Sequence, residues 1–223
     1  MFGKEVKRHG RDFYERIGID FEFPTLYEKL TARQNLAFFG SLYAAPARDI
    51  GALLARLELL QDADKRVSDY SKGMKSRLSF LRALINDPEV LFLDEPTSGL
   101  DPTSARLMKN IILEEKAKGK TVILTTHNMQ DAQELCDRVA FIVGGRIAAL
   151  DTPHNLIMRK GASSLRYSWR ENGVEQSGEC ALAHTGADAR LQKLLADGRL
   201  LTIHSAEPNL GDIFMEVTGR ALL

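Results

Sequence analysis

The chain has few cysteines and no long apolar run. Its 223 residues include two cysteines, Cys136 and Cys180, which lie far apart and form no Cys-x-x-Cys pattern and no cluster with the five histidines. This spacing argues against a disulfide framework and against a zinc module. No stretch approaches the roughly 18 apolar residues of a membrane-spanning helix, and the first residues lack the apolar core of a secretory signal. We therefore expect a cytosolic protein, or one that reaches a membrane only through a partner.

The chain also lacks a net charge, because 30 lysines and arginines balance 30 aspartates and glutamates. Binding to nucleic acid through overall charge requires a basic excess that neutralises phosphates, so no nucleic-acid partner is expected. Hydrophobic residues make up 44% and charged residues 27%, the ordinary range for globular chains. The length suits one large domain, or one domain with a small appendage.

Short apolar runs alternate with helical patterns through the middle of the chain. The predicted strands span residues 17–21, 90–93, 121–125, 139–143 and 146–150. Strands that are apolar throughout and alternate with helices predict a parallel sheet buried on both faces. Residues 31–86 hold three helical patterns and no strand. We therefore expect an α/β fold with an all-helical insertion at about residues 24–88.

The pattern changes after about residue 151. Tyr167 and Trp169 alternate with polar residues ahead of Asn172-Gly173, which predicts a β-hairpin with a type I′ turn. A helix, a strand at residues 200–204 and a final helix are expected to follow. We interpret residues 155–223 as a small α+β extension with its own core. Its final helix offers an apolar face made of Ile213, Phe214 and Val217.

Two adjacent carboxylates follow the apolar strand at residues 90–93. Asp94 and Glu95 stand at its carboxyl end, where the sheets of α/β folds place their ligands. Burying two carboxylates there is costly unless a cation compensates, and a magnesium ion on a nucleoside triphosphate is the usual one. Asp94 would then hold Mg²⁺, and Glu95 would orient or polarise the attacking water. The alternative is a pair of surface carboxylates before Pro96.

Three further segments place polar groups at the ends of predicted elements. The run Ser71-Lys72-Gly73-Met74 opens a helix, and its free amides make either an anion cradle or an ordinary serine N-cap. The run Ser98-Gly99-Leu100-Asp101-Pro102 is a tight turn into another helix. His127 follows the strand at residues 121–125, where an imidazole could meet a γ-phosphate or serve a structural role.

In this order and at these spacings, the segments resemble the ATP-binding subunits of ATP-binding cassette (ABC) transporters. YSKGMKSRL is similar to the signature segment, LFLDEP to the Walker B strand, SGLD to the D-loop and TTHNMQ to the switch-histidine segment. The resemblance covers residues 1–154. It implies a partial ABC nucleotide-binding domain with a P-loop NTPase-like core, and residues 155–223 look like the C-terminal extension of the drug-exporter branch.

The resemblance implies ATP hydrolysis coupled to export through a membrane permease. It assigns Asp94 to Mg²⁺, Glu95 and His127 to catalysis, and Asp101 to the D-loop at the nucleotide. Ser71, Lys72, Gly73 and Met74 would contact an ATP held by a second ATP-binding subunit, in a homodimer or a heterodimer. The helical insertion at about residues 23–43 would dock the permease. The subunit is then expected to be cytoplasmic and peripheral on the cytoplasmic face of the cell membrane.

The sequence departs from the family in two places. The Walker A pattern G-x-x-x-x-G-K-[ST] is absent, since Gly119-Lys120-Thr121 has Glu114 in place of the first glycine and precedes a strand instead of a helix. We expect that the chain begins after Walker A, as a fragment or a late-start product, and that it has negligible ATPase activity alone. Glu22 stands at the Q-loop glutamine position, from which its carboxylate could still approach Mg²⁺.

Two alternatives remain open. A non-catalytic ABC-like subunit would lend its signature face to a partner's ATP, or would only bind a permease. A DNA-repair or chromosome ATPase of the same superfamily would carry a long heptad coiled coil between the two halves of the site. No such repeat is present between Glu22 and Ser71.

Overall fold

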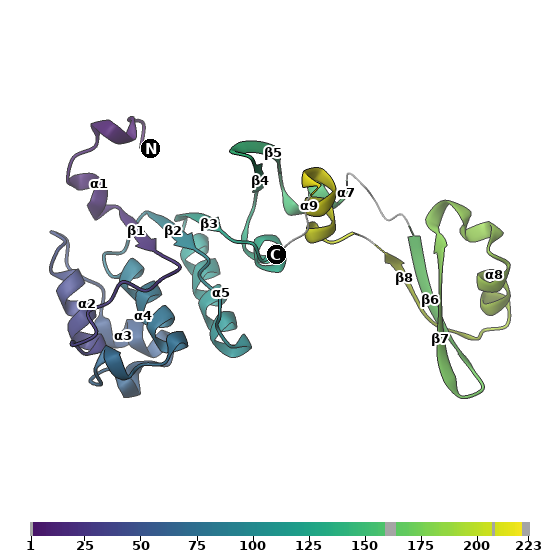
Figure 1. Ribbon diagram of the computed structural model, residues 1–223, viewed down its shortest axis with the longest axis horizontal. Coiled ribbons are helices and arrows are strands. Elements are labelled where there is room, and N and C mark those ends of the chain that lie inside the picture. Colours follow the sequence, from purple (N-terminus) through teal and green to yellow (C-terminus); the bar gives the residue numbers. More distant parts are fainter. Residues whose placement is uncertain (1, 159–163, 207, 220–223) are drawn as a thin grey trace. The chain divides into compact units, whose positions relative to one another are not determined.

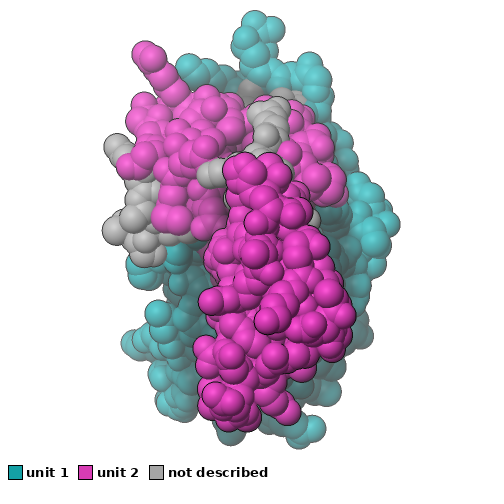
Figure 2. Space-filling view, turned by 90° about the vertical axis from the view of Figure 1, so that its right-hand side faces the viewer, with its two compact units in different colours: residues 1–127 teal, residues 128–223 magenta. Residues whose placement is uncertain are grey.

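The structure, a computed structural model, describes residues 2–158, 164–206 and 208–219. The chain divides into two compact units, residues 1–127 and residues 128–223, which Figure 2 shows in two colours. Within the described ranges, the first unit holds one sheet and the second unit holds two.

A parallel sheet of three strands forms the centre of the first unit (Figure 1). β1 (Ile17–Asp20), β2 (Val90–Asp94) and β3 (Thr121–Thr125) lie in the order β1-β2-β3. The register pairs Asp20 with Leu93 and Asp94 with Thr125, so the carboxyl ends of all three strands meet at one edge. The predicted α/β fold with a parallel sheet is confirmed.

Three helices occupy the chain between β1 and β2, as the three helical patterns predict. They are α2 (Ala32–Gly40), α3 (Ile50–Arg56) and α4 (Lys72–Leu84), with short 3₁₀ turns at Leu60–Asp62 and Val67–Asp69. α4 packs directly on β1 and buries Leu78, Phe80, Leu81 and Leu84 completely. α5 (Pro102–Ala117) connects β2 to β3, and α1 (Asp12–Glu15) precedes β1 after a 3₁₀ turn at Val6–Arg8. The bounds of a helical subdomain at residues 24–88 stay a prediction.

The expectation that every apolar strand is buried on both faces is wrong for the later strands. Ile123 of β3 is 43% exposed. β4 (Val139–Val143) and β5 (Arg146–Asp151) form a separate antiparallel hairpin, and Phe141 is the only buried side chain of β4. For β4 and β5 the connection explains the difference, because Gly144 and Gly145 both adopt positive φ angles and make a two-residue turn that reverses the chain into a hairpin.

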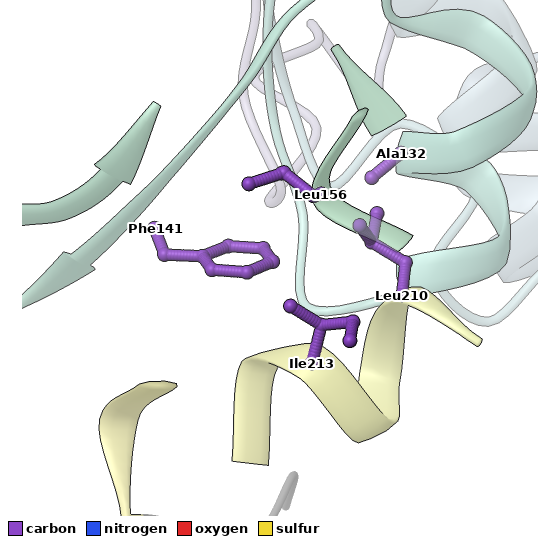
Figure 3. Packing of buried hydrophobic residues seen from close by; sticks show 5 residues of the cluster. All are labelled: Ala132, Phe141, Leu156, Leu210 and Ile213. Atoms are coloured by element: carbon purple, nitrogen blue, oxygen red, sulfur yellow. The ribbon is translucent and has the colours of Figure 1, made fainter. Parts of the chain in front are cut away.

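The second unit contains a core in which the hairpin packs against three helices. α6 (Met129–Leu135), α7 (Pro153–Met158) and α9 (Leu210–Thr218) surround it. Figure 3 shows that the buried side chains point toward one another: Ala132, Phe141, Leu156, Leu210 and Ile213. α9 begins with a capping box between Asn209 and Asp212, and it ends at Gly219 in the left-handed conformation.

A second small core lies in the antiparallel sheet β7-β6-β8. Its strands are β6 (Ser164–Glu171), β7 (Val174–Ala181) and β8 (Leu200–Ala206). Between β7 and β8 come a 3₁₀ stretch at Leu182–Ala187 and α8 (Ala189–Ala196). The predicted hairpin is confirmed, with positive φ angles at Asn172 and Gly173. Tyr167 and Trp169 pack against two leucines of α8.

The tail therefore has a core of its own around Tyr167 and Trp169, and its final helix also contributes to a second core around Phe141. α9 completes the core around Phe141, whereas the sheet β7-β6-β8 is covered by α8. Val217 is 44% exposed, so it does not belong to the buried face of α9. The domain boundary between residues 154 and 155 stays a prediction.

Candidate functional site

The carboxylates of Asp94 and Glu95 stand at the carboxyl edge of the parallel sheet, as predicted. Asp94 is the last residue of β2 and Glu95 follows it. Glu95 adopts a φ of 48°, a left-handed conformation that non-glycine residues avoid. Its backbone N–H donates to the carbonyl oxygen of Thr125 at 3.0 Å. This turn directs the Glu95 side chain toward the segment that follows β3.

The segment after β3 holds both carboxylates through three consecutive residues. The Thr125 hydroxyl donates to Asp94 Oδ1, and the Thr126 hydroxyl donates to Glu95 Oε2 at 3.1 Å. The backbone N–H of His127 donates to Glu95 Oε1 at 2.7 Å, and His127 Nδ1 lies 2.8 Å from the same oxygen. The structure therefore brings Asp94, Glu95 and His127 together.

The burial of these carboxylates differs from the expectation. Asp94 is exposed, and the Glu95 side chain is 17% exposed. The buried carboxyl of this edge belongs to Asp20, at the end of β1. Burial raises its pKa to about 7, and the nearby charge of Asp94 adds to the rise, although a hydrogen bond from Ser79 and the charge of Arg82 oppose it.

The signature segment forms the start of α4. Ser71 is the N-cap, and its hydroxyl oxygen accepts from the Met74 amide at 3.2 Å. Lys72 and Gly73 occupy the first turn, where backbone N–H groups have no partner within the helix. Lys72 Nζ lies 3.3 Å from the position that a β-carbon on Gly99 would occupy. The signature segment and the D-loop of this chain are therefore neighbours.

Asp101 caps the next helix. Its carboxylate accepts from the Ser104 amide at 2.9 Å, and Pro102 occupies the first turn of α5. Hydrogen bonds from Ser104 lower the pKa of Asp101. The structure thus shows a capping role for Asp101, and its proposed contribution to a nucleotide site stays a prediction.

Glu22 lies two residues beyond β1 and is exposed. The segment after it is held by Arg82 of α4, which the sequence patterns did not single out. Arg82 donates to the carbonyl oxygen of Thr25 at 2.7 Å and to its hydroxyl at 2.5 Å, and its guanidinium lies 5.0 Å from the centre of the Phe39 ring. A groove of about 470 Å³ is lined by Pro24, Thr25, Leu26, Tyr27, Phe39 and Arg82.

The donor set at the sheet edge suits a magnesium ion bound together with a nucleotide. No three His, Cys, Asp or Glu side chains cluster as metal ligands in the part of the chain that the structure describes. Mg²⁺ carried by a nucleoside triphosphate takes one or two protein carboxylates and completes its shell with phosphate oxygens and water. The exposed carboxylate of Asp94 meets that requirement.

Sequence comparisons place the chain among known proteins. Residues 1–98 match the family described as "ABC transporter". A fluoroquinolones export ATP-binding protein of Mycobacterium tuberculosis is 50% identical over 223 residues, which span 100% of this chain and 74% of the relative. The chain belongs to the ATP-binding subunits of ABC transporters.

Other ABC ATP-binding subunits agree with this assignment. The Nod factor export ATP-binding protein I of Rhizobium meliloti is 38% identical over 242 residues, covering 100% of this chain and 71% of the relative. A solved structure described as "Structure of ATP binding subunit of ABC transporter" superposes with a TM-score of 0.64 at 26% identity. The superposition covers 72% of this chain and 69% of that one.

ABC ATP-binding subunits hydrolyse ATP to drive transport and work with membrane permeases. The relatives are named as export subunits, which favours the ATP-hydrolysing interpretation over a non-catalytic partner protein. Every helix in the described ranges is too short or too polar to span a membrane.

Proposed function

We propose that Asp94, Glu95 and His127 form the hydrolytic centre through which this ABC subunit cleaves Mg²⁺-bound ATP. The observation that carries the proposal is the fixed position of the Glu95 carboxylate, which accepts hydrogen bonds from Thr126 and His127 on the neighbouring strand's loop. A general base must be held within hydrogen-bond reach of the water it activates.

Each residue has a separate task in this scheme. Glu95 takes the proton from the attacking water, and the new oxygen bond forms at the γ-phosphorus as ADP leaves. His127 anchors Glu95 and offers an imidazole, 64% exposed, toward the transferring phosphoryl group. Asp94 would hold Mg²⁺, which neutralises charge on the phosphate oxygens when bound. Glu22 would supply a further oxygen close to the ion.

The amides at the start of α4 suit the phosphates of an ATP held by a second ATP-binding subunit. The first turn of this 13-residue helix carries the positive end of the helix dipole. Lys72 adds a cation beside it, and Ser71, Gly73 and Met74 complete the segment. We place Asp101 at the same interface between the two subunits.

The groove around Arg82 is the proposed contact with the permease. Phe23 is 75% exposed beside it, and Phe21, Tyr27 and Phe38 are exposed as well. An exposed cluster of large apolar side chains marks a protein interaction surface. Docking there would place the subunit peripherally on the cytoplasmic face of the cell membrane. The cargo would be an organic compound that the permease selects, as the fluoroquinolone and Nod factor names of the relatives suggest.

The hydrolytic centre is tested by Glu95→Gln in a subunit that also carries a Walker A loop, assembled with its permease and partner subunit. Loss of the base is expected to lower kcat for ATP by about 100-fold or more while ATP binding persists. Glu114→Gln, an exposed glutamate of α5, is the matched control and should turn over normally. Turnover of the Glu95→Gln variant at the wild-type rate would remove Glu95 from the mechanism.

Docking is tested separately with Phe23→Asp. Placing a charge in the apolar surface is expected to abolish copurification with the permease. Tyr14→Asp is the control, because Tyr14 is also an exposed aromatic residue but belongs to α1, whereas Phe23 directly precedes Pro24 in the lining of the groove. Equal loss of the permease from both variants would argue against the groove as the contact.

A further inference from the structure

Thr125 and Thr126 meet Asp94 and Glu95 in matched order. The parallel register of β2 and β3 places Thr125 beside Asp94. The residue after each of these lies beside the other in the same way, so the Thr126 hydroxyl reaches the Glu95 carboxylate. The backbone bond from Glu95 N–H to Thr125 O extends the ladder one step beyond the end of β2. Two consecutive hydroxyls are thus paired with two consecutive carboxylates.

The two oxygens of Glu95 have different surroundings. Oε1 accepts the His127 amide at 2.7 Å and lies 2.8 Å from His127 Nδ1. Oε2 accepts the Thr126 hydroxyl at 3.1 Å. An ionised carboxylate has about four acceptor positions on its two oxygens. Oε1 accepts the His127 amide and faces the His127 ring nitrogen, whereas Oε2 keeps one acceptor position open beside its bond to Thr126.

The backbone at Glu95 gives a reason for a second anchor. A φ of 48° is unfavourable for a residue with a side chain, and such strain persists only where surrounding contacts enforce it. The last side-chain torsion of Glu is otherwise broad, and rotation about it moves both carboxylate oxygens together. The His127 contacts hold Oε1 and the Thr126 hydroxyl holds Oε2, so the two sets of contacts together define this torsion.

We propose that Thr126 is a positioning residue for the hydrolytic reaction: its hydroxyl fixes the Glu95 carboxylate and selects Oε2 as the oxygen that receives the proton of water. The inference rests on the proposed role of Glu95 as the base. Thr126 touches neither ATP nor water in this scheme, and it acts through Glu95 alone.

The test compares Thr126→Val with Thr126→Ser in the assembled transporter. Valine keeps the β-branched shape that suits the end of a strand and removes the hydroxyl. We expect Thr126→Val to lower kcat about tenfold, since one hydrogen bond to a charged group is lost, with KM for ATP changed less than twofold. Serine restores the hydroxyl and should recover most of the turnover. Thr121→Val makes the same substitution at the other end of β3, beside Val90, and is the control.

A second measurement needs no turnover. Hydrogen exchange of the His127 amide is followed in the 223-residue chain, because this amide donates to the carboxylate that Thr126 holds. The His127 amide should exchange several-fold faster in the Thr126→Val variant than in the Thr121→Val variant, and the two variants should have similar melting temperatures. Thr126→Ser should keep the protection of the wild-type chain.

The outcomes separate the two proposals. If Glu95→Gln turns over normally, the role of Glu95 fails, whatever Thr126 does. If Glu95→Gln is inactive while Thr126→Val matches Thr121→Val in both kcat and His127 exchange, the inference about Thr126 is overturned. A Thr126→Val variant that serine does not rescue, with a lower melting temperature and a raised KM, would show a structural role instead.

Discussion

The carbonyl oxygen of Ala83 lies 2.0 Å from the position that a β-carbon on Gly18 would occupy. Gly18 is the second residue of β1, and Ala83 lies near the end of α4. The Pro88 ring approaches the same position at 2.9 Å. The missing side chain lets the signature helix lie directly on the strand that leads to Glu22.

Gly18→Ala is therefore expected to push α4 away from β1. The added methyl group meets backbone, which cannot rotate aside, so we expect a loss of about 3 kcal/mol in the free energy of unfolding. Urea unfolding followed by circular dichroism measures this loss. Gly10→Ala is the control, since the nearest atom to its new methyl group would be Asp12 Oδ1 at 3.7 Å. A wild-type midpoint for Gly18→Ala would contradict the close packing.

A buried glutamate joins the helical insertion to α5. Glu115 has no exposed surface, and Arg48, Arg56, Lys118 and Lys120 all contact its carboxylate. Glu115→Gln leaves these cations without their common partner, which is expected to cost about 3 kcal/mol. The neighbouring Glu114 pairs with Arg56 at the surface, so Glu114→Gln should cost less than about 1 kcal/mol. Equal losses in the two variants would contradict the central place of Glu115.

The same residue gives a prediction about pH. Burial alone would raise the pKa of Glu115, but hydrogen bonds from Lys118 and Lys120 and the charges of Lys120 and Arg48 outweigh it and lower the pKa from 4.5 to about 2. A carboxyl with a lowered pKa stabilises the fold above its ordinary pKa and loses that contribution as the pH falls. Unfolding measured between pH 4.5 and pH 2 should therefore show a steeper loss of stability in the wild type than in Glu115→Gln.

Phe214 connects the final helix to the hairpin. Its ring meets that of Phe141 edge to face, with centroids 5.3 Å apart. Phe214→Ala is expected to destabilise the second unit by about 2–3 kcal/mol, because it removes apolar contact and one aromatic pair. Met215→Ala, at an exposed position of the same helix, should change stability by less than about 0.5 kcal/mol. Thermal unfolding of both variants measures the difference, and similar midpoints would argue against α9 as part of this core.

Arg82 gives a prediction about the segment that carries Glu22. Arg82 donates from Nη1 to both oxygens of Thr25 and from Nη2 to the carbonyl oxygen of Ile19. The single ammonium of lysine cannot reproduce this two-nitrogen arrangement, so Arg82→Lys should release residues 21–27. We expect the amides of this segment to exchange with deuterium about tenfold faster, which corresponds to about 1.4 kcal/mol of lost local stability. Arg77→Lys is the control, since Arg77 of the same helix donates instead to Leu57 O. Faster exchange over residues 21–27 in the control would show a general loosening of α4.

The sequence predicts the local parts of the structure well and the distant contacts poorly. β2 and β3 lie where the sequence has apolar runs that end in polar residues. The hairpin turn forms at Asn172-Gly173 because a type I′ turn requires positive φ angles at two positions, which Asn and Gly tolerate. The contacts of Thr126 with Glu95 and of Arg82 with Thr25 span 31 and 57 residues. Periodicity carries no information about such pairs, since they depend on the register between strands and on helix packing.

The same limit explains the differences at Asp20 and in the tail. Asp20 extends an apolar run, and its burial against Ser79 follows from how closely α4 lies on β1. The apolar face of α9 is visible in the sequence, but the sequence does not show that its partner is the hairpin around Phe141. The matched order of Thr125-Thr126 and Asp94-Glu95 is the one signal that could have indicated the paired hydroxyls in advance.

The packing of α7 against α9 has a consequence for how the tail can change. In the sequence, α7 precedes β6 and α9 follows β8, so the segment from β6 to β8 is inserted between two helices that pack in the same core. Such a segment can be shortened, lengthened or exchanged without disturbing the residues around Phe141. We expect length differences among relatives to concentrate between α7 and α9, and replacement of residues 159–207 by a short glycine-serine linker should leave the final helix docked.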